Sequence, residues 1–404
     1  MHVGPFHSLT SRLILIVSLI SISSFAKTPD PLSDPGFQHF YNLEYEEALK
    51  VFRARADLSP TDPAAQNYLA QTVLYHEMFR NRALDSDLLN ASNAFMTRPR
   101  MKVTSEHHRL FDEAINRSIS ICQQKLTVNS RDAASLYSLG VSYALRANWN
   151  AMVTHEFFNV LRDATNARKL HNQVLEIDPD LMDARFVQAA HDYVVGSLPG
   201  PVKLLGFLAG FKGDREAGMR NLRLVAEGGS MNRVDAAVLL SAILRRERRS
   251  GEAVPLLASV SSQFPRNYLF RFELARMYAD SGDKGNAIAS LDRIDQLRAK
   301  GSPGFKTLPP EQIAYDKGNV YFWYDDLDMA ISELKRATAD GGGALDPDAA
   351  ALAWLRLGQA LDLKGERGEA RSAYSSAARV SPASESAKEA RAFLSYPYKR
   401  KRRA

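Results

Sequence analysis

The sequence has few of the features that would support catalysis or covalent stabilisation. It contains a single cysteine, Cys122, in 404 residues, which excludes an intramolecular disulfide framework. It has no Gly-rich phosphate loop, no Gly-x-Ser-x-Gly elbow and no paired-cysteine metal motif. After residue 26, no apolar run is long and continuous enough to form a membrane helix. We therefore expect a fold stabilised by packing, without cofactor or metal, and a non-enzymatic function.

The first 26 residues have the pattern of an export signal. Arg12 precedes an apolar run at residues 13–22, and Ser24 and Ala26 are small residues at the positions that signal peptidase inspects. The apolar run has about half of the ~20 residues that a membrane span needs, which favours a cleaved signal over an uncleaved anchor. We expect the mature chain to begin near Lys27 and to be exported to the periplasm or cell envelope.

The positive charge is modest and locally concentrated. The formal net charge is +6 at pH 7, and basic residues gather at positions 245–249 and 399–403. The basic residues at 245–249 stand at the end of a predicted first helix. Cations are favourable there, because they meet the negative end of the helix dipole. Aromatic residues are not interleaved with these cations, so we expect no nucleic-acid binding.

A helix-pair pattern with a period of 34 residues is clearest in residues 351–384. Apolar residues at helical spacing mark a first and a second helix, small residues stand where two helices would approach closely, and a proline follows the second helix. The residues are Trp354, Leu357, Gly358, Leu361, Ala370, Tyr374, Ala377 and Pro382. Pairs at a fixed period predict a solenoid, an architecture whose usual function is to hold other proteins.

These eight residues resemble the consensus of the tetratricopeptide repeat (TPR). The resemblance continues through two contiguous repeats at 234–301, a linker at 302–310 and two repeats at 311–384. Residues 27–230 read as divergent TPR-like pairs with insertions at 77–105, 148–162 and 196–213, and residues 385–404 as a capping helix and basic tail. Short phrases at 40–43, 145–148 and 191–199 look like those of exported bacterial TPR proteins. The resemblance implies an all-α, right-handed TPR-type α-solenoid of about eight helix pairs, with inserted loops and a C-terminal capping helix.

The resemblance also implies a binding groove on the concave face. Positions 2, 5, 9 and 12 of a TPR usually point into it, and in this chain they include Arg245, Phe272, Arg276, Tyr315, Asn319, Phe322, Leu355 and Gln359. Cations, aromatic rings and amides suit a peptide ligand, although the aromatic rings could equally pack between helices. The TPR carboxylate clamp needs Lys at position 5 and Asn at position 9, and only Asn319 fits, with Tyr315 in place of Lys.

The sequence thus predicts an exported scaffold that binds a protein or peptide partner through its concave face, in an envelope assembly or adaptor role. One alternative is a peripheral membrane or envelope-polymer protein that uses the basic tail and a hydrophobic lobe at 194–211. The lobe contains Leu198, Leu204, Leu205, Phe207, Leu208 and Phe211, and it could equally fold into the solenoid's own groove.

Another alternative is an enzyme with a site in the insertions, around His76, His107 or His191 and Asp192. His76-Glu77 and His155-Glu156 begin like a zinc-protease motif. Arg80 and Asn159 stand where that motif requires its second histidine. Cys122 lies on an apolar helical stripe, so we expect a buried small side chain rather than a nucleophile.

Overall fold

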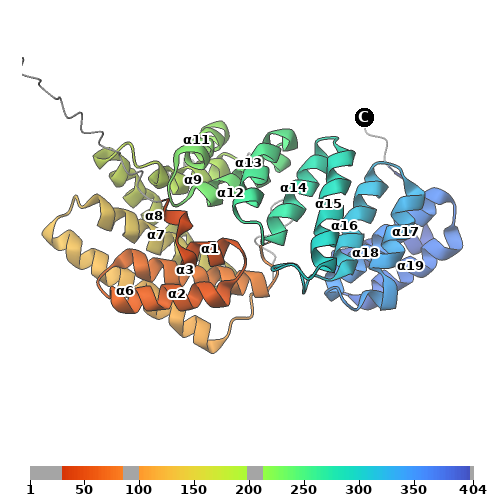
Figure 1. Cartoon of the computed structure of the whole chain (residues 1–404), viewed down its shortest axis with the longest axis horizontal. Helices are drawn as coiled ribbons and strands as arrows, with labels where there is room; N and C mark the ends of the chain where they lie inside the picture. The colour runs from red at the N-terminus through yellow and green to blue at the C-terminus, as the bar shows by residue number, and fades with distance from the viewer. Residues whose placement is uncertain (1–29, 85–99, 198–212, 401–404) are drawn as a thin grey trace, which may run out of the picture.

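The structure, a computed structural model, describes residues 30–84, 100–197 and 213–400. Seventeen α-helices and no strand occur in these ranges. The helices form eight consecutive pairs and a final single helix, and neighbours along the chain pack on one another (Figure 1). The predicted all-α solenoid of about eight helix pairs is confirmed.

The pairs are α1 (Pro35–Tyr41) with α2 (Tyr45–Leu58), α3 (Pro63–Arg80) with α6 (Ser105–Val128), α7 (Ala133–Trp149) with α8 (Phe157–Ile177), α9 (Arg185–Gly196) with α11 (Arg215–Gly228), α12 (Arg233–Arg246) with α13 (Ser250–Gln263), α14 (Tyr268–Asp280) with α15 (Lys284–Ala299), α16 (Pro310–Trp323) with α17 (Leu327–Ala337), and α18 (Pro347–Lys364) with α19 (Arg367–Val380). The final helix is α20 (Glu385–Ser395).

Local sequence determines where several first helices begin. Asp34, Asp62 and Asp346 each precede a proline that opens a helix, and each carboxylate accepts a hydrogen bond from the backbone N–H two residues further on. Proline has no backbone N–H, and at the first helical position this costs no hydrogen bond, because an N–H there would have no partner within the helix. The aspartate side chain accepts a hydrogen bond from a neighbouring N–H. The Asp-Pro dipeptide therefore fixes the start of α1, α3 and α18.

Small residues allow the two helices of a pair to approach closely. A Cβ atom added at Gly358 of α18 would lie 2.5 Å from the ring of Tyr374 on α19. One added at Gly318 of α16 would lie 2.7 Å from Leu334 on α17. Tyr374 and Leu334 are fully buried. The glycine of the first helix therefore makes room for the large side chain of the second, as the repeat pattern predicted.

The three predicted insertions differ in structure. In the first, α3 continues to Arg80 and α6 begins at Ser105, with residues 85–99 outside the described part. The segment 148–162 is mostly helix, because α7 passes through a π-helical turn at Asn150–Thr154 and α8 begins at Phe157. Its extra residues lengthen two helices instead of forming a loop. In the third, residues 198–212 lie outside the described part.

The linker at 302–310 is an integral part of the core. Phe305 and Leu308 are buried among side chains of α14, α15 and α16. Gly304 has a φ of +84°, and a Cβ atom there would collide with the carbonyl oxygen of Arg266. Only glycine readily adopts this positive φ and also lacks the Cβ atom that would collide. The linker thus packs α16 against the α14–α15 pair, and α14 and α16 line the groove described below.

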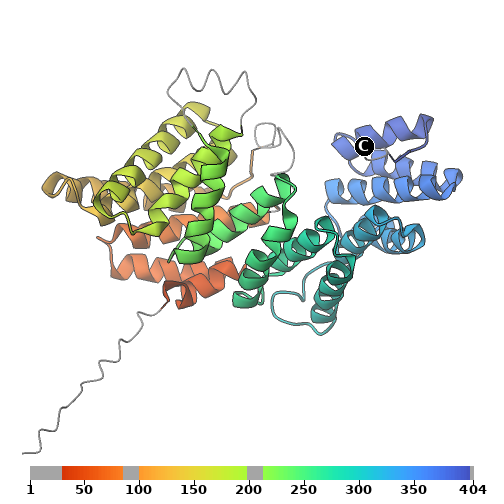
Figure 2. The same cartoon turned by 90° about the horizontal axis from the view of Figure 1, so that it is seen from above.

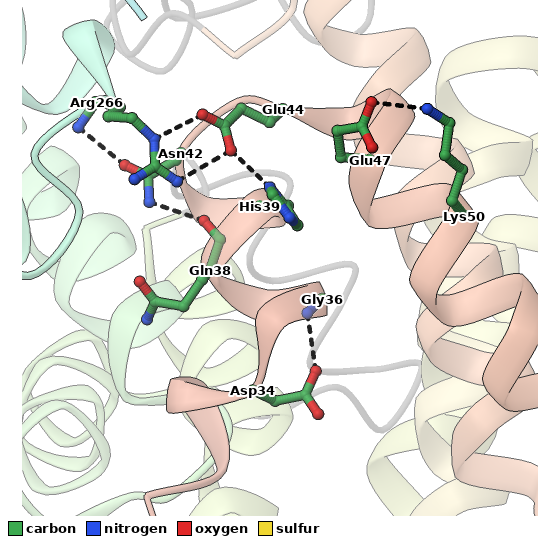
Figure 3. A network of polar contacts seen from close by, with 9 residues as sticks. All are labelled: Asp34, Gly36, Gln38, His39, Asn42, Glu44, Glu47, Lys50 and Arg266. Atoms are coloured by element: carbon green, nitrogen blue, oxygen red, sulfur yellow. Dashed lines mark hydrogen bonds and ion pairs between the residues drawn. The ribbon is translucent and has the colours of Figure 1, made fainter. Parts of the chain in front are cut away.

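The beginning of the solenoid closes onto its middle (Figures 1 and 2). Arg266, between α13 and α14, donates two hydrogen bonds to the Glu44 carboxylate at 2.6 and 3.0 Å. Its backbone N–H donates to Asn42 Oδ1 at 2.9 Å, as Figure 3 shows. Asn267 donates to the carbonyl oxygen of Tyr41 at 2.7 Å. We call this set the α1 clasp. It joins residues more than 200 positions apart, so the first helix pairs form a closed turn, and α16 to α20 extend from it as an arm.

The C-terminal end is covered as predicted. Ala387 and Ala390 of α20 are buried, and Phe393 packs against Tyr374 with ring centroids 5.4 Å apart. The chain then turns back towards α16. There Arg400 donates to Asp325 Oδ1 at 2.9 Å and to the carbonyl oxygen of Phe322 at 2.6 Å. At least this residue of the predicted basic tail therefore belongs to the folded solenoid.

Candidate functional site

The inner faces of α12, α14 and α16 form a groove, which we call the inner groove. Its volume is about 490 Å³. Each of these helices is the first of its pair, the position that lines the concave face of a helix-pair solenoid. Of the eight residues predicted from sequence, Arg245, Arg276 and Asn319 line this groove. Three separate repeats contribute them, so only the superhelical stacking brings them together.

The two groove arginines are neutralised by neighbouring carboxylates. Arg245 donates to Asp280 at 2.6 Å. Arg276 donates to Glu273 at 2.8 Å and contacts Asp316 at 3.4 Å, and all three side chains are at least 85% buried. Partly buried pairs of this kind hold the side chains in fixed positions. The groove therefore presents a rigid polar surface of nearly balanced charge rather than a cationic one.

Asn319 has an unfulfilled hydrogen-bonding capacity. Its Oδ1 atom is buried and has no hydrogen-bond partner. A buried amide oxygen without a partner costs about 1–3 kcal/mol, which a bound donor would recover. Asn319 lines the inner groove, so a hydrogen-bond donor bound there would satisfy this oxygen.

Trp323 is the most exposed aromatic residue of the inner groove, and the sequence pattern missed it. Half of its surface is exposed, and the Arg356 guanidinium lies 5.0 Å from its ring. The repeat consensus pointed to position 322 instead. However, Asp316, Asn319 and Trp323 follow the spacing i, i+3, i+7, which places residues on one helix face. That spacing could have identified Trp323 from the sequence.

Four predicted groove residues are buried in the solenoid and do not line the inner groove. Phe272, Phe322, Leu355 and Gln359 each expose 4% of their surface or less. The Phe322 ring is covered by Arg356 and Arg400, whose guanidinium carbons lie 4.6 and 4.9 Å from its centroid. These four side chains pack between neighbouring repeats, and Phe272 also lines the second cavity described below. Tyr315 is partly exposed and packs against the last repeats instead of lining the inner groove.

The residues of the enzyme alternative fall into two separate clusters. His107 Nδ1 lies 2.5 Å from Glu77 Oε1, and the ring of His76 is 5.1 Å from that of His107. Burial, together with the nearby His107, lowers the pKa of His76 below its ordinary value. His191 and Asp192 lie apart from these, on α9. In the described ranges no three His, Cys, Asp or Glu side chains are arranged to hold a metal ion.

Several predictions concern parts of the chain outside the described residues. These are the export signal at 1–26 and the lobe residues Leu198, Leu204, Leu205, Phe207, Leu208 and Phe211. Within the described ranges, no helix is both long and apolar enough to cross a membrane. Cys122 is fully buried, and burial raises the pKa of its thiol to about 11. The expectation that it packs as a small apolar side chain is confirmed.

Comparison with known proteins supports the repeat class. Residues 197–301, about a quarter of the chain, match the family described as Iml2/Tetratricopeptide repeat protein 39. No curated protein matches the chain. The match supports a TPR-type repeat over these residues, and the eight helix pairs of the described ranges have the helix-pair architecture of such repeats. Repeats of this type act as scaffolds for protein–protein interaction and are typically non-catalytic.

Proposed function

We propose that this TPR-type repeat protein binds an extended segment of a protein partner in its inner groove. The observation that carries the proposal is the pairing of Asn319 with Trp323 on one face of α16. The first has a buried oxygen that lacks a partner, and the second has a half-exposed indole. Together they offer one group that orients a peptide backbone and one that anchors an apolar side chain.

The groove chemistry favours a peptide over a free anion. Arg245 and Arg276 are already paired with carboxylates of α14 and α16. A carboxylate or phosphate ligand would have to displace these partners. A peptide backbone is neutral and needs hydrogen-bonding groups and flat apolar surfaces, which the groove supplies. With Tyr315 where a carboxylate clamp requires lysine, the proposed ligand is an internal segment of a partner and not a free C-terminus.

The proposed setting is the cell envelope. Residues 1–26 have the sequence pattern of an export signal, and the described part of the chain has a solenoid fold with a single cysteine and therefore no internal disulfide. A partner-binding solenoid in that compartment suits the role of an assembly factor or adaptor of an envelope complex. Export is tested by determining the N-terminal residue of the protein recovered from the envelope fraction, with Lys27 as the expected result.

Peptide binding is tested with a displayed library of random linear peptides and the chain from residue 27 to 404. We expect enriched peptides that bind in the inner groove. Trp323→Ala should weaken their binding about tenfold or more, which corresponds to at least about 1.4 kcal/mol. Asn319→Ala should weaken binding about three- to tenfold, which corresponds to the free energy that one hydrogen bond contributes.

Two variants serve as controls for this test. Tyr396→Ala removes an aromatic residue that is 78% exposed on the C-terminal segment, and Asn116→Ala removes an exposed amide on α6. Neither residue lines the inner groove, so both variants should bind the peptides like the unchanged protein. Peptides whose affinity falls equally in the control and groove variants, or in none of them, would contradict the proposal.

A further inference from the structure

A second cavity lies at the other end of the same two helices. It has a volume of about 440 Å³ and is lined by the first turns of α14 and α16, the end of α3 and the segments at 307–309 and 344–345. We call it the aromatic pocket. It meets the inner groove at Arg276, which lines both. We call the two cavities together the trough, and the contact of Arg276 with Asp316 divides it.

The walls of the aromatic pocket are formed by aromatic rings from distant parts of the chain. Phe79 of α3 and Tyr268 of α14 have ring centroids 6.4 Å apart. Tyr268 meets Phe272 edge to face at 6.3 Å. Leu308 and Leu345 add aliphatic surface. Rings at these distances and angles favour a further ring placed against them edge to face or offset.

The charged groups that line the aromatic pocket are paired. Arg80 donates to Glu77 at 2.7 Å, Arg82 forms an ion pair with Asp346, and Arg276 bonds to Glu273. A charged ligand would therefore find no unpaired charge among these three arginines. His76 is 92% buried, lines the pocket, and has an Nδ1 atom without a hydrogen-bond partner. A ligand that suits this pocket is neutral, with a ring and one hydrogen-bonding group.

We infer that the aromatic pocket receives a tyrosine or tryptophan side chain from the same peptide that lies in the inner groove. The inference rests on the proposed function. Gln312, in the pocket, and Asn319, in the groove, are seven residues apart on α16, a rise of about 10 Å. An extended peptide advances about 3.3 Å per residue. The aromatic residue therefore stands three or four positions from the residue whose backbone meets Asn319.

The alternatives to such a side chain fit the aromatic pocket less well. An aliphatic side chain would leave the buried His76 nitrogen without a partner, at a cost that a phenol or an indole N–H avoids. A cationic side chain would find no free carboxylate there, because Glu77, Asp346 and Glu273 are already paired with Arg80, Arg82 and Arg276. A helix is wider than one side chain, about 10 Å across, and would collide with the residues that divide the trough. An extended segment with one aromatic anchor satisfies all of these conditions.

The test compares three forms of the chain from residue 27 to 404. Ala344→Trp fills the aromatic pocket from its rim, where Ala344 is exposed, so no core contact is removed. Ala54→Trp places the same side chain on the exposed face of α2 as a control. Trp323→Ala reports on the inner groove alone. The ligands are the peptides enriched from the random library, each beside a copy whose aromatic residue is replaced by alanine.

We expect the enriched peptides to carry Tyr or Trp at the stated spacing and to bind Ala344→Trp at least tenfold more weakly than the control. The alanine copies should bind both forms equally. If Trp323→Ala weakens binding but Ala344→Trp does not, peptide binding in the inner groove is supported and the aromatic-pocket inference is wrong. If no peptide depends on Trp323, the proposed function itself fails.

Free p-cresol, a mimic of the tyrosine side chain, tests whether the aromatic pocket binds a phenol ring in the absence of a peptide. Saturation-transfer NMR should detect its binding to the unchanged protein and to Ala54→Trp, and should lose the signal with Ala344→Trp. Absence of binding to the unchanged protein would overturn the inference, whatever the peptides show. Binding of p-cresol together with peptides that lack an aromatic preference would also overturn it, because the occupant would then not be a peptide side chain.

Discussion

Removing the Arg266 side chain should release the start of the solenoid from its middle. Arg266 holds Glu44 through two hydrogen bonds of 2.6 and 3.0 Å, with side chains 35% and 27% exposed. Hydrogen bonds to charged groups contribute about 1.5–3 kcal/mol when shielded, and exposed ion pairs about 0.2–1 kcal/mol. This pair lies between these limits, so Arg266→Met should weaken the α1 clasp by about 1.5–2 kcal/mol. The methionine keeps the apolar stem, and the backbone N–H still reaches Asn42.

The consequence is local, because repeat proteins unfold in parts and not as one unit. Hydrogen exchange followed by mass spectrometry should show the α1 and α2 amides opening about 10- to 30-fold more often, since 1.4 kcal/mol is a factor of ten. Exchange in α18 to α20 should not change. Arg336→Met is the matched control, because its pair with Glu333 joins neighbouring turns of α17 and is 53% exposed at the arginine. A change below about threefold, or one spread evenly over the chain, would refute the reasoning.

The same clasp predicts a pH dependence. Burial alone raises the pKa of Glu44, but hydrogen bonds from Arg266 and His39 outweigh it and lower the pKa below the ordinary value of 4.5. A carboxyl group whose folded-state pKa is depressed stabilises the fold fully above its unfolded pKa. That contribution is lost as the pH falls through the folded-state pKa. Exchange at α1 should therefore be insensitive to pH from 7 to 5, after correction for intrinsic rates, and should accelerate below about 4.5.

Three further predictions concern the packed interior. Gly358→Ala places a methyl group against Tyr374 and should destabilise the last repeats by about 1–3 kcal/mol in thermal unfolding, whereas Gly368→Ala, with nothing within 4 Å, should not. Burial raises the pKa of Asp235 to about 7. A raised folded-state pKa gives stability that is lost as the pH rises through it, so Asp235→Asn should raise the unfolding temperature more at pH 8.5 than at pH 5.5. Because its buried thiol has a pKa of about 11, Cys122 should resist iodoacetamide at pH 8 until the protein is unfolded in urea.

The fold was predictable where the sequence acts locally. The 34-residue period predicts which residues of one helix pair meet. The structure shows such a contact between the small Gly358 and the large Tyr374. The α1 clasp was not predictable, because Glu44 and Arg266 meet only after more than four helix pairs have stacked. Their contact depends on the accumulated rotation of all those pairs. The extra residues at 148–162 were misread as a loop because a π-helical turn has no sequence signal that one chain reveals.

The candidate site was predictable in part for the same reason. Arg245, Arg276 and Asn319 stand at positions that the resemblance to the TPR consensus assigns to the groove, and in the structure they line one cavity. Position 12 of the consensus, however, lies near the end of the helix, where a small rotation decides between core and groove. There Phe322 turned inward and Trp323 outward. The aromatic pocket had no sequence signature, since Phe79 and Leu345 come from opposite halves of the chain.

Site-specific photo-crosslinking in the cells that produce the protein can show whether a partner occupies the inner groove. A photoreactive phenylalanine analogue replaces Trp323 in the inner groove, and in a second strain it replaces Met329, which is 49% exposed on α17 outside the groove. We expect a discrete crosslinked protein from position 323 and none from position 329. Equal products from both positions, or a product from position 329 alone, would contradict binding in the inner groove.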